Sequence, residues 1–311
     1  MKIAIVGMGG IGGHIGAKLA RFYQDNDYIH IFFIARGAHL EKIKQDGLRF
    51  ISPQEDYYVT PAIATDDAKE CGKMDYIFYC TKSYDIETAV ETIKPLIMRS
   101  TVIVPILNGV DGAEKMRELL PDTVVADGLA YIISAIKEPG VVEEITDKAY
   151  FLYGDKNEFT LTLMLLESIC RDAGLNITYD KDIEYKVWDK FEFISCVASI
   201  TTAYNITYGD VLYTEKYFEE FTALAAEFRA VGYAKGALLE SEDRFGKLVN
   251  KVKSLPAIAT TSMQRDFWAG KNSELESLTH YIIIEGEKLG VSTPQYKKLY
   301  EMMINKQNTL L

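Results

Sequence analysis

The apolar positions in the first half of the chain fall into short continuous runs, and amphipathic stretches separate them. The runs are rich in β-branched and aromatic residues, which favours buried strands at 2–6, 30–35, 75–80, 101–105 and 123–125. Helical patterns lie between them, including 85–97 and 112–120. Alternation of strands and helices with short connections predicts a parallel, doubly wound sheet.

The pattern changes after this alternation. The runs 131–136, 141–146 and 149–153, with a turn at Pro139-Gly140, predict antiparallel strands that extend the sheet. Beyond Asp180 the spacing is helical, at 182–204, 215–235, 273–289 and 293–306. Ser273 with Glu276 has the spacing of a capping box, and Thr293-Pro294 predicts an N-cap followed by proline at the first helical position.

A glycine motif joins the first strand to the first helix. Its residues are Gly7, Met8, Gly9, Gly10, Ile11 and Gly12. In Gly-x-Gly-x-x-Gly between a strand and a helix, the first glycine permits a tight turn, the second lets a pyrophosphate approach, and the third allows close packing. The predicted fold class is therefore α/β: a Rossmann-type dinucleotide-binding domain at 1–178 with an antiparallel extension, followed by an all-α substrate domain at 179–311.

The residue after the second strand indicates which dinucleotide binds. A carboxylate at this place would bond the ribose 2′-hydroxyl of NAD, whereas this chain has Arg36 followed by Gly37. A guanidinium can bind a 2′-phosphate with its planar fork of donors. We therefore expect NADP(H) as the cofactor.

Composition excludes several other partners. The formal net charge of −11 argues against nucleic acid or an anionic membrane. The four cysteines are scattered and have no metal-ligand spacing, so we expect reduced thiols and no metal. The first strand begins at residue 2, which leaves no room for a signal peptide, and we expect a cytoplasmic protein. The helical half could bury a homodimer face, although nothing in the sequence requires one.

Reduction of a carbonyl needs a proton donor as well as a hydride, because charge develops on the oxygen. The four histidines lie singly on predicted elements or beside them and are better explained as structural or exposed residues: His14, His30, His39 and His280. A lysine is then the remaining candidate, by elimination.

Several motifs occur together along the chain. They are the glycine turn with Arg36, Thr81-Lys82 after the third strand, Asn108-Gly109 after the next, Trp188-Asp-Lys190, and Ser262-Met-x-x-Asp266 followed by Lys271-Asn-Ser-Glu274. In this order they resemble the 2-dehydropantoate 2-reductase (ketopantoate reductase) family over nearly the whole chain.

The resemblance implies roles for these positions. Lys190 would be the general acid, Glu274 would hold the substrate or the lysine, and Asn108 would orient the lysine and contact the cofactor. Lys82 and Arg36 would bind the cofactor. Ser262 would bind the substrate carboxylate, with Asp266 nearby. Partial desolvation would lower the pKa of such a lysine toward the working pH. We expect the active site between the carboxyl edge of the sheet and the helices.

This chain departs from the family at three places. Members of the family carry asparagines after the lysine that bind the substrate's hydroxyl and carboxylate. Counting without gaps, these positions are Ile194, Ala198 and Tyr208 here. Three neighbours could compensate only if the helix register were shifted: Ser195, Ser199 and Asn205. Loss of such an amide can change substrate discrimination by orders of magnitude.

Three hypotheses follow. The first is NADPH-dependent reduction of a small 2-oxo acid, foremost 2-dehydropantoate to (R)-pantoate in pantothenate biosynthesis, with Lys190 as general acid. The second is reduction of a different, more apolar 2-oxo acid. The third is a non-catalytic NADP(H)-binding sensor that retains the fold.

Overall fold

The computed structural model describes residues 1–311 except 147, 156–160, 241–242 and 311. The chain separates into two compact units. Unit 1 comprises Met1–Leu107 and Gly112–Ile183, and unit 2 comprises Asn108–Asp111 and Glu184–Leu311. The predicted α/β fold class with a helical second half is confirmed.

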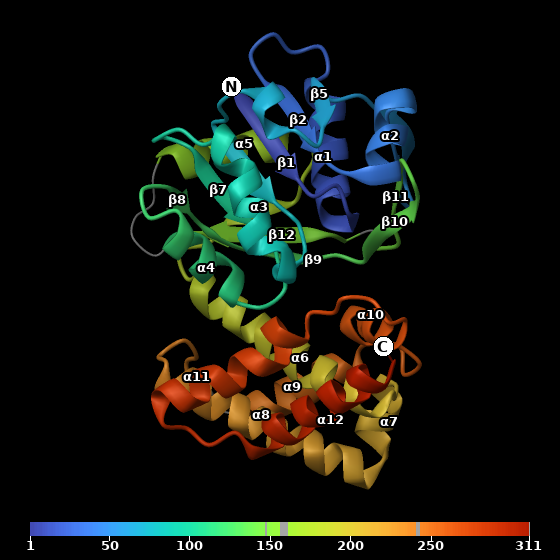
Figure 1. Ribbon diagram of the computed structural model, residues 1–311, viewed down its shortest axis with the longest axis vertical. Helices are drawn as coiled ribbons and strands as arrows, with labels where there is room; N and C mark the ends of the chain where they lie inside the picture. The colour runs from blue at the N-terminus through green and yellow to red at the C-terminus, as the bar shows by residue number, and fades with distance from the viewer. Residues whose placement is uncertain (147, 156–160, 241–242, 311) are drawn as a thin grey trace. The chain divides into compact units, whose positions relative to one another are not determined.

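Unit 1 is built on a six-stranded parallel sheet of order β5-β2-β1-β6-β7-β8 (Figure 1). Its strands are β1 (Lys2–Val6), β2 (His30–Ile34), β5 (Ile63–Thr65), β6 (Tyr76–Tyr79), β7 (Val102–Pro105) and β8 (Val124–Val125). The five predicted strands are all present, and β5 is one that the sequence pattern missed. Its connecting helices are α1 (Gly10–Tyr23), α2 (Gly37–Asp46), α3 (Ile86–Ile93) and α4 (Asp111–Leu119).

The central strands are apolar on both faces because each face has its own core. Ile3 and Ile5 of β1 belong to one buried cluster with Phe33 and Phe78. Alternate residues of the same strand, Ala4 and Val6, belong to a second cluster that includes residues of α3. This explains why these strands read as continuous apolar runs rather than alternating ones.

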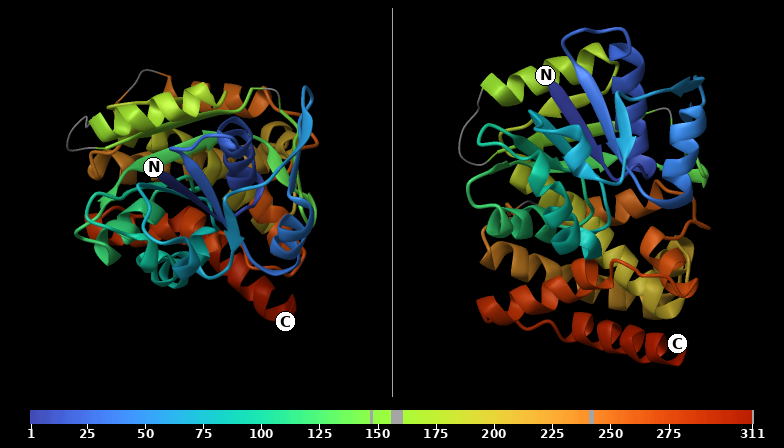
Figure 2. Two further views of the ribbon diagram at one scale, coloured as in Figure 1. Left: turned by 90° about the horizontal axis from the view of Figure 1, so that it is seen from above. Right: turned by 45° about the horizontal axis from the view of Figure 1, so that its top comes forward.

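Two small sheets complete unit 1. One has the order β10-β11-β3-β4 and the other β13-β12-β9. Their strands are β3 (Leu48–Ile51), β4 (Asp56–Val59), β9 (Asp127–Tyr131), β10 (Ser134–Glu138), β11 (Val141–Glu144), β12 (Tyr150–Gly154) and β13 (Ile177–Tyr179). The helix α5 (Leu161–Asp172) packs beside β13 (Figure 2).

The antiparallel strands expected after the main sheet are present as the pairs β10–β11 and β12–β9. They do not continue the parallel sheet. The single strand predicted at 131–136 instead contains the last residue of β9 and the first three residues of β10, which belong to different small sheets. Each small sheet also contains a parallel pair, β11–β3 in one and β12–β13 in the other.

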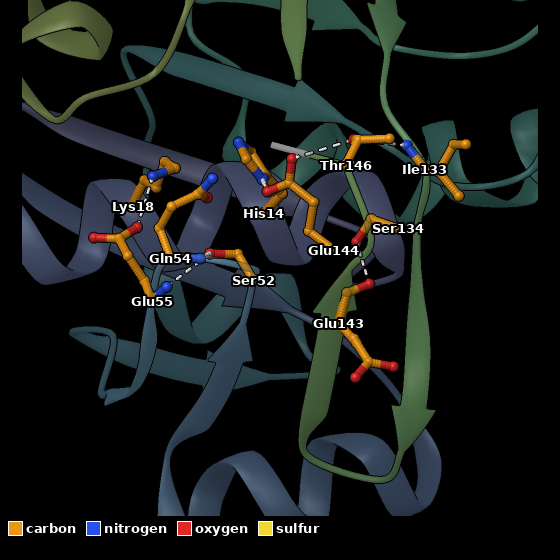
Figure 3. A network of polar contacts seen from close by, with 10 residues as sticks. All are labelled: His14, Lys18, Ser52, Gln54, Glu55, Ile133, Ser134, Glu143, Glu144 and Thr146. Atoms are coloured by element: carbon orange, nitrogen blue, oxygen red, sulfur yellow. Dashed lines mark hydrogen bonds and ion pairs between the residues drawn. The ribbon is translucent and has the colours of Figure 1, made fainter. Parts of the chain in front are cut away.

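A polar network joins α1 to the sheet that contains β11 (Figure 3). Nδ1 of His14 lies 2.9 Å from Oε2 of Glu144, and both side chains are almost fully buried. One turn further along α1, Nζ of Lys18 lies 3.0 Å from Oε2 of Glu55. A Cβ on Gly10 would lie 2.1 Å from the carbonyl oxygen of Ser134, so the start of α1 can lie this close to β10 only with glycine at that position. These contacts fix the helix that follows the glycine turn.

Unit 2 is helical. Its elements are α6 (Ile183–Tyr204), α7 (Tyr208–Tyr213), α8 (Glu215–Ala234), α9 (Arg244–Lys253), α10 (Ser262–Trp268), a single turn of π-helix at Glu276–His280, α11 (Tyr281–Leu289) and α12 (Pro294–Leu310). Helices α11 and α12 both lie beside α8 in Figure 1. The core is aromatic: Trp188 and Phe191 of α6 pack against Phe228 of α8 and Tyr281 of α11.

The two helix caps predicted for this unit need correction. Proline does stand first in α12, but the hydroxyl of Thr293 is buried without a hydrogen-bond partner. The carboxylate of Glu227 from α8 accepts from the backbone N–H groups of Gln295 at 2.8 Å and Tyr296 at 3.0 Å instead. A carboxylate there satisfies two amides at once and matches the helix dipole, which a hydroxyl cannot do.

The capping box predicted for Ser273 is also wrong. The helical stretch starts after Glu274, and the carboxylate of Glu276 bonds Nδ1 of His280 at 2.6 Å and the hydroxyl of Tyr300 at 2.8 Å. Because the helical backbone begins at Leu275, Ser273 lies one position too early to be the N-cap residue.

Candidate active site

The glycine turn connects the carboxyl end of β1 to the start of α1. Gly7 has φ +89°, and a Cβ there would lie 2.9 Å from the backbone of Cys80 and Thr81 at the end of β6. A Cβ on Gly12 would lie 2.1 Å from the carbonyl oxygen of Gly7. At Gly9 there is nothing within 4 Å of the corresponding position. The backbone is therefore open at the glycine where a pyrophosphate would approach, and the residues present fit a dinucleotide.

Arg36 and Lys82 follow the strands on either side of β1. Arg36 is exposed and precedes α2, directly after β2 and Ala35. Lys82 is partly buried and lies three residues beyond β6. Because β2, β1 and β6 are neighbours in a parallel sheet, their carboxyl ends lie at one edge. That edge thus combines the amide groups of a helix N-terminus with two cationic side chains, which suits phosphate groups.

His39 stands alone in the sequence, but in unit 1 it is hydrogen-bonded to the turn between β10 and β11. Its Nδ1 accepts a hydrogen bond of 3.0 Å from the backbone N–H of Gly140, between β10 and β11. Burial lowers its pKa, and the carbonyl of Met8 in the glycine turn opposes that shift. A neutral ring that accepts at Nδ1 carries its proton on Nε2, and the hydrogen bond at Nδ1 holds His39 against the turn at Gly140.

In unit 2, the structure brings Lys190 and Asn108 together. Nζ of Lys190, in the second turn of α6, lies 3.4 Å from Oδ1 of Asn108. Asn108 lies three residues beyond the end of β7, and the chain turns at Gly109, which has φ +84°. The amide oxygen accepts from the ammonium, so Asn108 limits the directions in which Lys190 can aim its remaining protons.

The pKa of Lys190 is lowered to about 8 by burial and by the nearby ammonium of Lys251, while the carboxylate of Glu274 raises it. Glu274 is only 3% exposed, and it directly precedes the helical stretch that contains the π turn. A general acid works best when its pKa lies near the operating pH. A lysine with a pKa of about 8 can donate a proton near neutral pH, and this is the chemistry that the arrangement could support.

Asn108 and Glu274 are also linked through their own segments. The hydroxyl of Ser277, in the π turn, donates to Oδ2 of Asp111 at 3.1 Å. Both residues are buried. The loop 108–111 and the segment 274–277 are therefore held against each other, which fixes the segments that carry Asn108 and Glu274.

Ser262 and Asp266 lie one turn apart on α10, as their spacing predicted. Both are partly buried. The start of α10 lies beside Thr201, where the hydroxyls of Thr201 and Thr261 are 3.4 Å apart. Thr201 is eleven residues beyond Lys190 in α6, or roughly 16 Å along the helix axis. The role of Ser262 and Asp266 in substrate binding stays a prediction.

All four cysteines are free thiols. Among the residues that the structure describes, no helix is both long and apolar enough to be a candidate membrane span.

Comparisons with known proteins cover both units. The family model described as Ketopantoate reductase PanE/ApbA matches residues 3–158, and the model of its C-terminal part matches residues 182–307. An uncharacterized oxidoreductase, YkpB of Bacillus subtilis, is 28% identical over 96% of this chain and 97% of its own length. A 2-dehydropantoate 2-reductase of Mesorhizobium japonicum is 26% identical over 94% of each chain.

The solved structures agree with these sequence matches. The crystal structure of 2-dehydropantoate 2-reductase from Porphyromonas gingivalis W83 is 34% identical and superposes with a TM-score of 0.86, covering 98% of this chain and 99% of that one. Because the two family models together span most of the sequence and both units, the chain belongs to the ketopantoate reductase family of oxidoreductases.

Proposed function

We propose that this protein reduces a small 2-oxo acid to the 2-hydroxy acid with NADPH, and that 2-dehydropantoate is the substrate. The observation that supports this most directly is the contact between Lys190 and Asn108, together with a lysine pKa of about 8. Reduction of 2-dehydropantoate is the reaction named for the family and for the relative from Mesorhizobium japonicum.

Each residue of the candidate site has a part in the proposed reaction. The reduced nicotinamide, when bound, supplies a hydride to the C2 carbon of the oxo acid. An N–H of Lys190 donates its proton to the ketone oxygen as charge develops there, and the neutral amine then regains a proton from solvent. Asn108 accepts another N–H of the ammonium and so aims the donor. Glu274 keeps the ammonium protonated in a site where burial alone would favour the amine.

The choice of NADP(H) rests on Arg36. This exposed guanidinium follows β2, where a carboxylate would be needed to bond an unmodified ribose. The glycine turn beside it can take the pyrophosphate at the N-terminus of α1.

The test is steady-state reduction of 2-dehydropantoate with NADPH, comparing wild type with Lys190→Ala. The matched control is Lys186→Ala, one turn earlier on α6, where the lysine is exposed. We expect the first variant to lose at least a hundredfold in kcat, in line with general acid–base contributions of about 10²–10⁴. The control should keep the wild-type rate. Equal rates in wild type and Lys190→Ala would contradict the proposed mechanism.

A different, more apolar 2-oxo acid is the second candidate substrate. It is favoured by the side chains that follow Lys190: Ile194 is partly buried and offers no hydrogen bond, and Ala198 is 1% exposed. Branched and aryl 2-oxo acids assayed in parallel would separate the two. A sensor without activity would instead bind NADPH and reduce none of them.

A further inference from the structure

Helix α9 docks on α6 at the turn that carries Lys190. Nε of Arg244, the first residue of α9, lies 3.0 Å from Oε2 of Glu192, and its guanidinium also pairs with Asp189. Glu192 is buried, so this contact is a fixed part of the packing. Asp189 and Glu192 flank Lys190 in the sequence. The N-terminal end of α9 is therefore held beside the turn that contains the lysine.

A lysine of α9, Lys251, lies against the same part of α6. Lys251 is seven residues, or about two turns, beyond Arg244, so the two side chains share one face of the helix. Its Nζ lies 4.8 Å from the centroid of the Phe193 ring. Phe193 is three residues after Lys190, and such neighbours have Cβ atoms about 5–6 Å apart on a helix surface. Two lysines from different helices thus converge on one region.

The electrostatics agree with this convergence. The charge of Lys251 contributes to the lowered pKa of Lys190. Burial lowers the pKa of Lys251 as well, and Asp189 opposes the shift. Holding two ammonium groups this near each other costs free energy in the empty protein. An anion that binds between them recovers that cost, because it attracts both.

We propose that Lys251 binds the carboxylate of the 2-oxo acid while Lys190 protonates its ketone oxygen. The assignment rests on the proposed function. In a 2-oxo acid the carboxylate and the ketone are on adjacent carbons, so the two groups need cationic partners that lie close together and come from different directions. Lys190 on α6 and Lys251 on α9 are two such cations, since their charges interact and Lys251 lies over the ring of Phe193, about one turn from Lys190.

The test compares Lys251→Gln with Lys253→Gln. Both remove one positive charge from the end of α9, but Lys253 is exposed. For the 2-oxo acid, we expect KM to rise about 10- to 100-fold in Lys251→Gln, as for the loss of a hydrogen bond to a charged group, with a smaller change in kcat. Lys251→Arg should recover part of the affinity. KM in Lys253→Gln should stay at the wild-type value.

Two further measurements distinguish a carboxylate contact from a structural role. The methyl ester of the same oxo acid lacks the negative charge, so wild type and Lys251→Gln should reduce it with equal KM. Removing the neighbouring charge should also raise the pKa of Lys190 and move the alkaline limb of the kcat/KM profile to higher pH. An unchanged KM for the acid, or an equal loss for acid and ester, overturns the proposal.

The proposed function can fail separately. Should wild type reduce no oxo acid, calorimetry with oxamate in the presence of NADP⁺ still tests the lysine, because oxamate is a 2-oxo acid analogue that is not reduced. Tighter binding to wild type and Lys253→Gln than to Lys251→Gln supports the anion site. Wild-type protein that binds oxamate no better than Lys251→Gln overturns it. Melting temperatures of the variants confirm that each is folded.

Discussion

Nζ of Lys190 and Oδ1 of Asn108 lie 3.4 Å apart although 82 residues separate them in the chain. One belongs to the first long helix of the helical unit. The other belongs to a four-residue loop, Asn108–Asp111, which leaves unit 1 after β7 and is part of unit 2. The lysine and the group that orients it are therefore held in one compact unit.

Removing that amide should slow the reaction without abolishing binding. Asn108→Ala leaves the ammonium with fewer constraints and without one acceptor. A hydrogen bond to a charged group contributes about 1.5–3 kcal/mol, so we expect kcat to fall about 10- to 100-fold. Steady-state assays with saturating NADPH check this. Asn250→Ala, an exposed asparagine on α9, is the control; a kcat equal to wild type in Asn108→Ala would show that the amide does not orient the lysine.

The pH profile should report the lowered pKa of Lys190. The acid must be protonated to donate, so kcat/KM should decline as the pH rises through about 8. Glu274 raises this pKa, so Glu274→Gln should shift the decline to lower pH. Profiles of the two proteins over the same buffers provide the measurement. A shift toward higher pH in the variant would have the wrong sign for the assigned interaction.

Arg36 should determine the choice between the two nicotinamide dinucleotides. Arg36→Ala removes the guanidinium that would bond the 2′-phosphate, and we expect KM for NADPH to rise at least tenfold while KM for NADH stays within a factor of two or so. Arg99→Ala changes another exposed arginine of unit 1 and controls for net charge. Equal losses with both cofactors would indicate that Arg36 supports the fold of the turn instead.

Stability measurements can locate the cap of α12. Glu227→Ala removes the carboxylate that accepts from two amides at the start of the helix, and should lower the free energy of unfolding by about 1–2 kcal/mol. Thr293→Val removes a buried hydroxyl that has no partner and should cost almost nothing. Urea titrations of both variants test this. A larger loss of unfolding free energy in Thr293→Val than in Glu227→Ala would show that Thr293 is the cap.

The main sheet could be predicted because its strands are apolar on both faces, which gives uninterrupted runs such as 2–6 and 30–34. The strands β3 and β4 were missed because they are short, and only Val59 of the four residues in β4 is buried. The strands β10, β11 and β12 were recognised, whereas β13 and most of β9 were not. The division of these strands into separate sheets depends on partners distant in sequence. Pairing of β11 with β3, for example, leaves no local signal.

The candidate site, like the fold, could be predicted from the sequence only in part. The glycine turn could be identified from local spacing, since Gly7 and Gly12 are required by contacts within the turn or with the end of the neighbouring β6, and Gly9 leaves the backbone open. Lys190, Asn108 and Glu274 were singled out by resemblance to a family, because no spacing rule relates three residues so far apart. Lys251 and His39 carry no motif. Their relevance depends on which helix or turn packs beside them, and only the coordinates give that.

The π turn at Glu276–His280 has a consequence for how this helix can change. It contains one residue more than an α-turn would, and it separates Glu274 from the core positions Ile282 and Ile283 of α11. Deleting one residue there would restore an ordinary helix but rotate everything before it by about 100°. Either the carboxylate of Glu274 would move away from Lys190, or Ile282 and Ile283 would leave the hydrophobic core. Descendants of this chain can therefore vary the residues of that turn far more easily than its length.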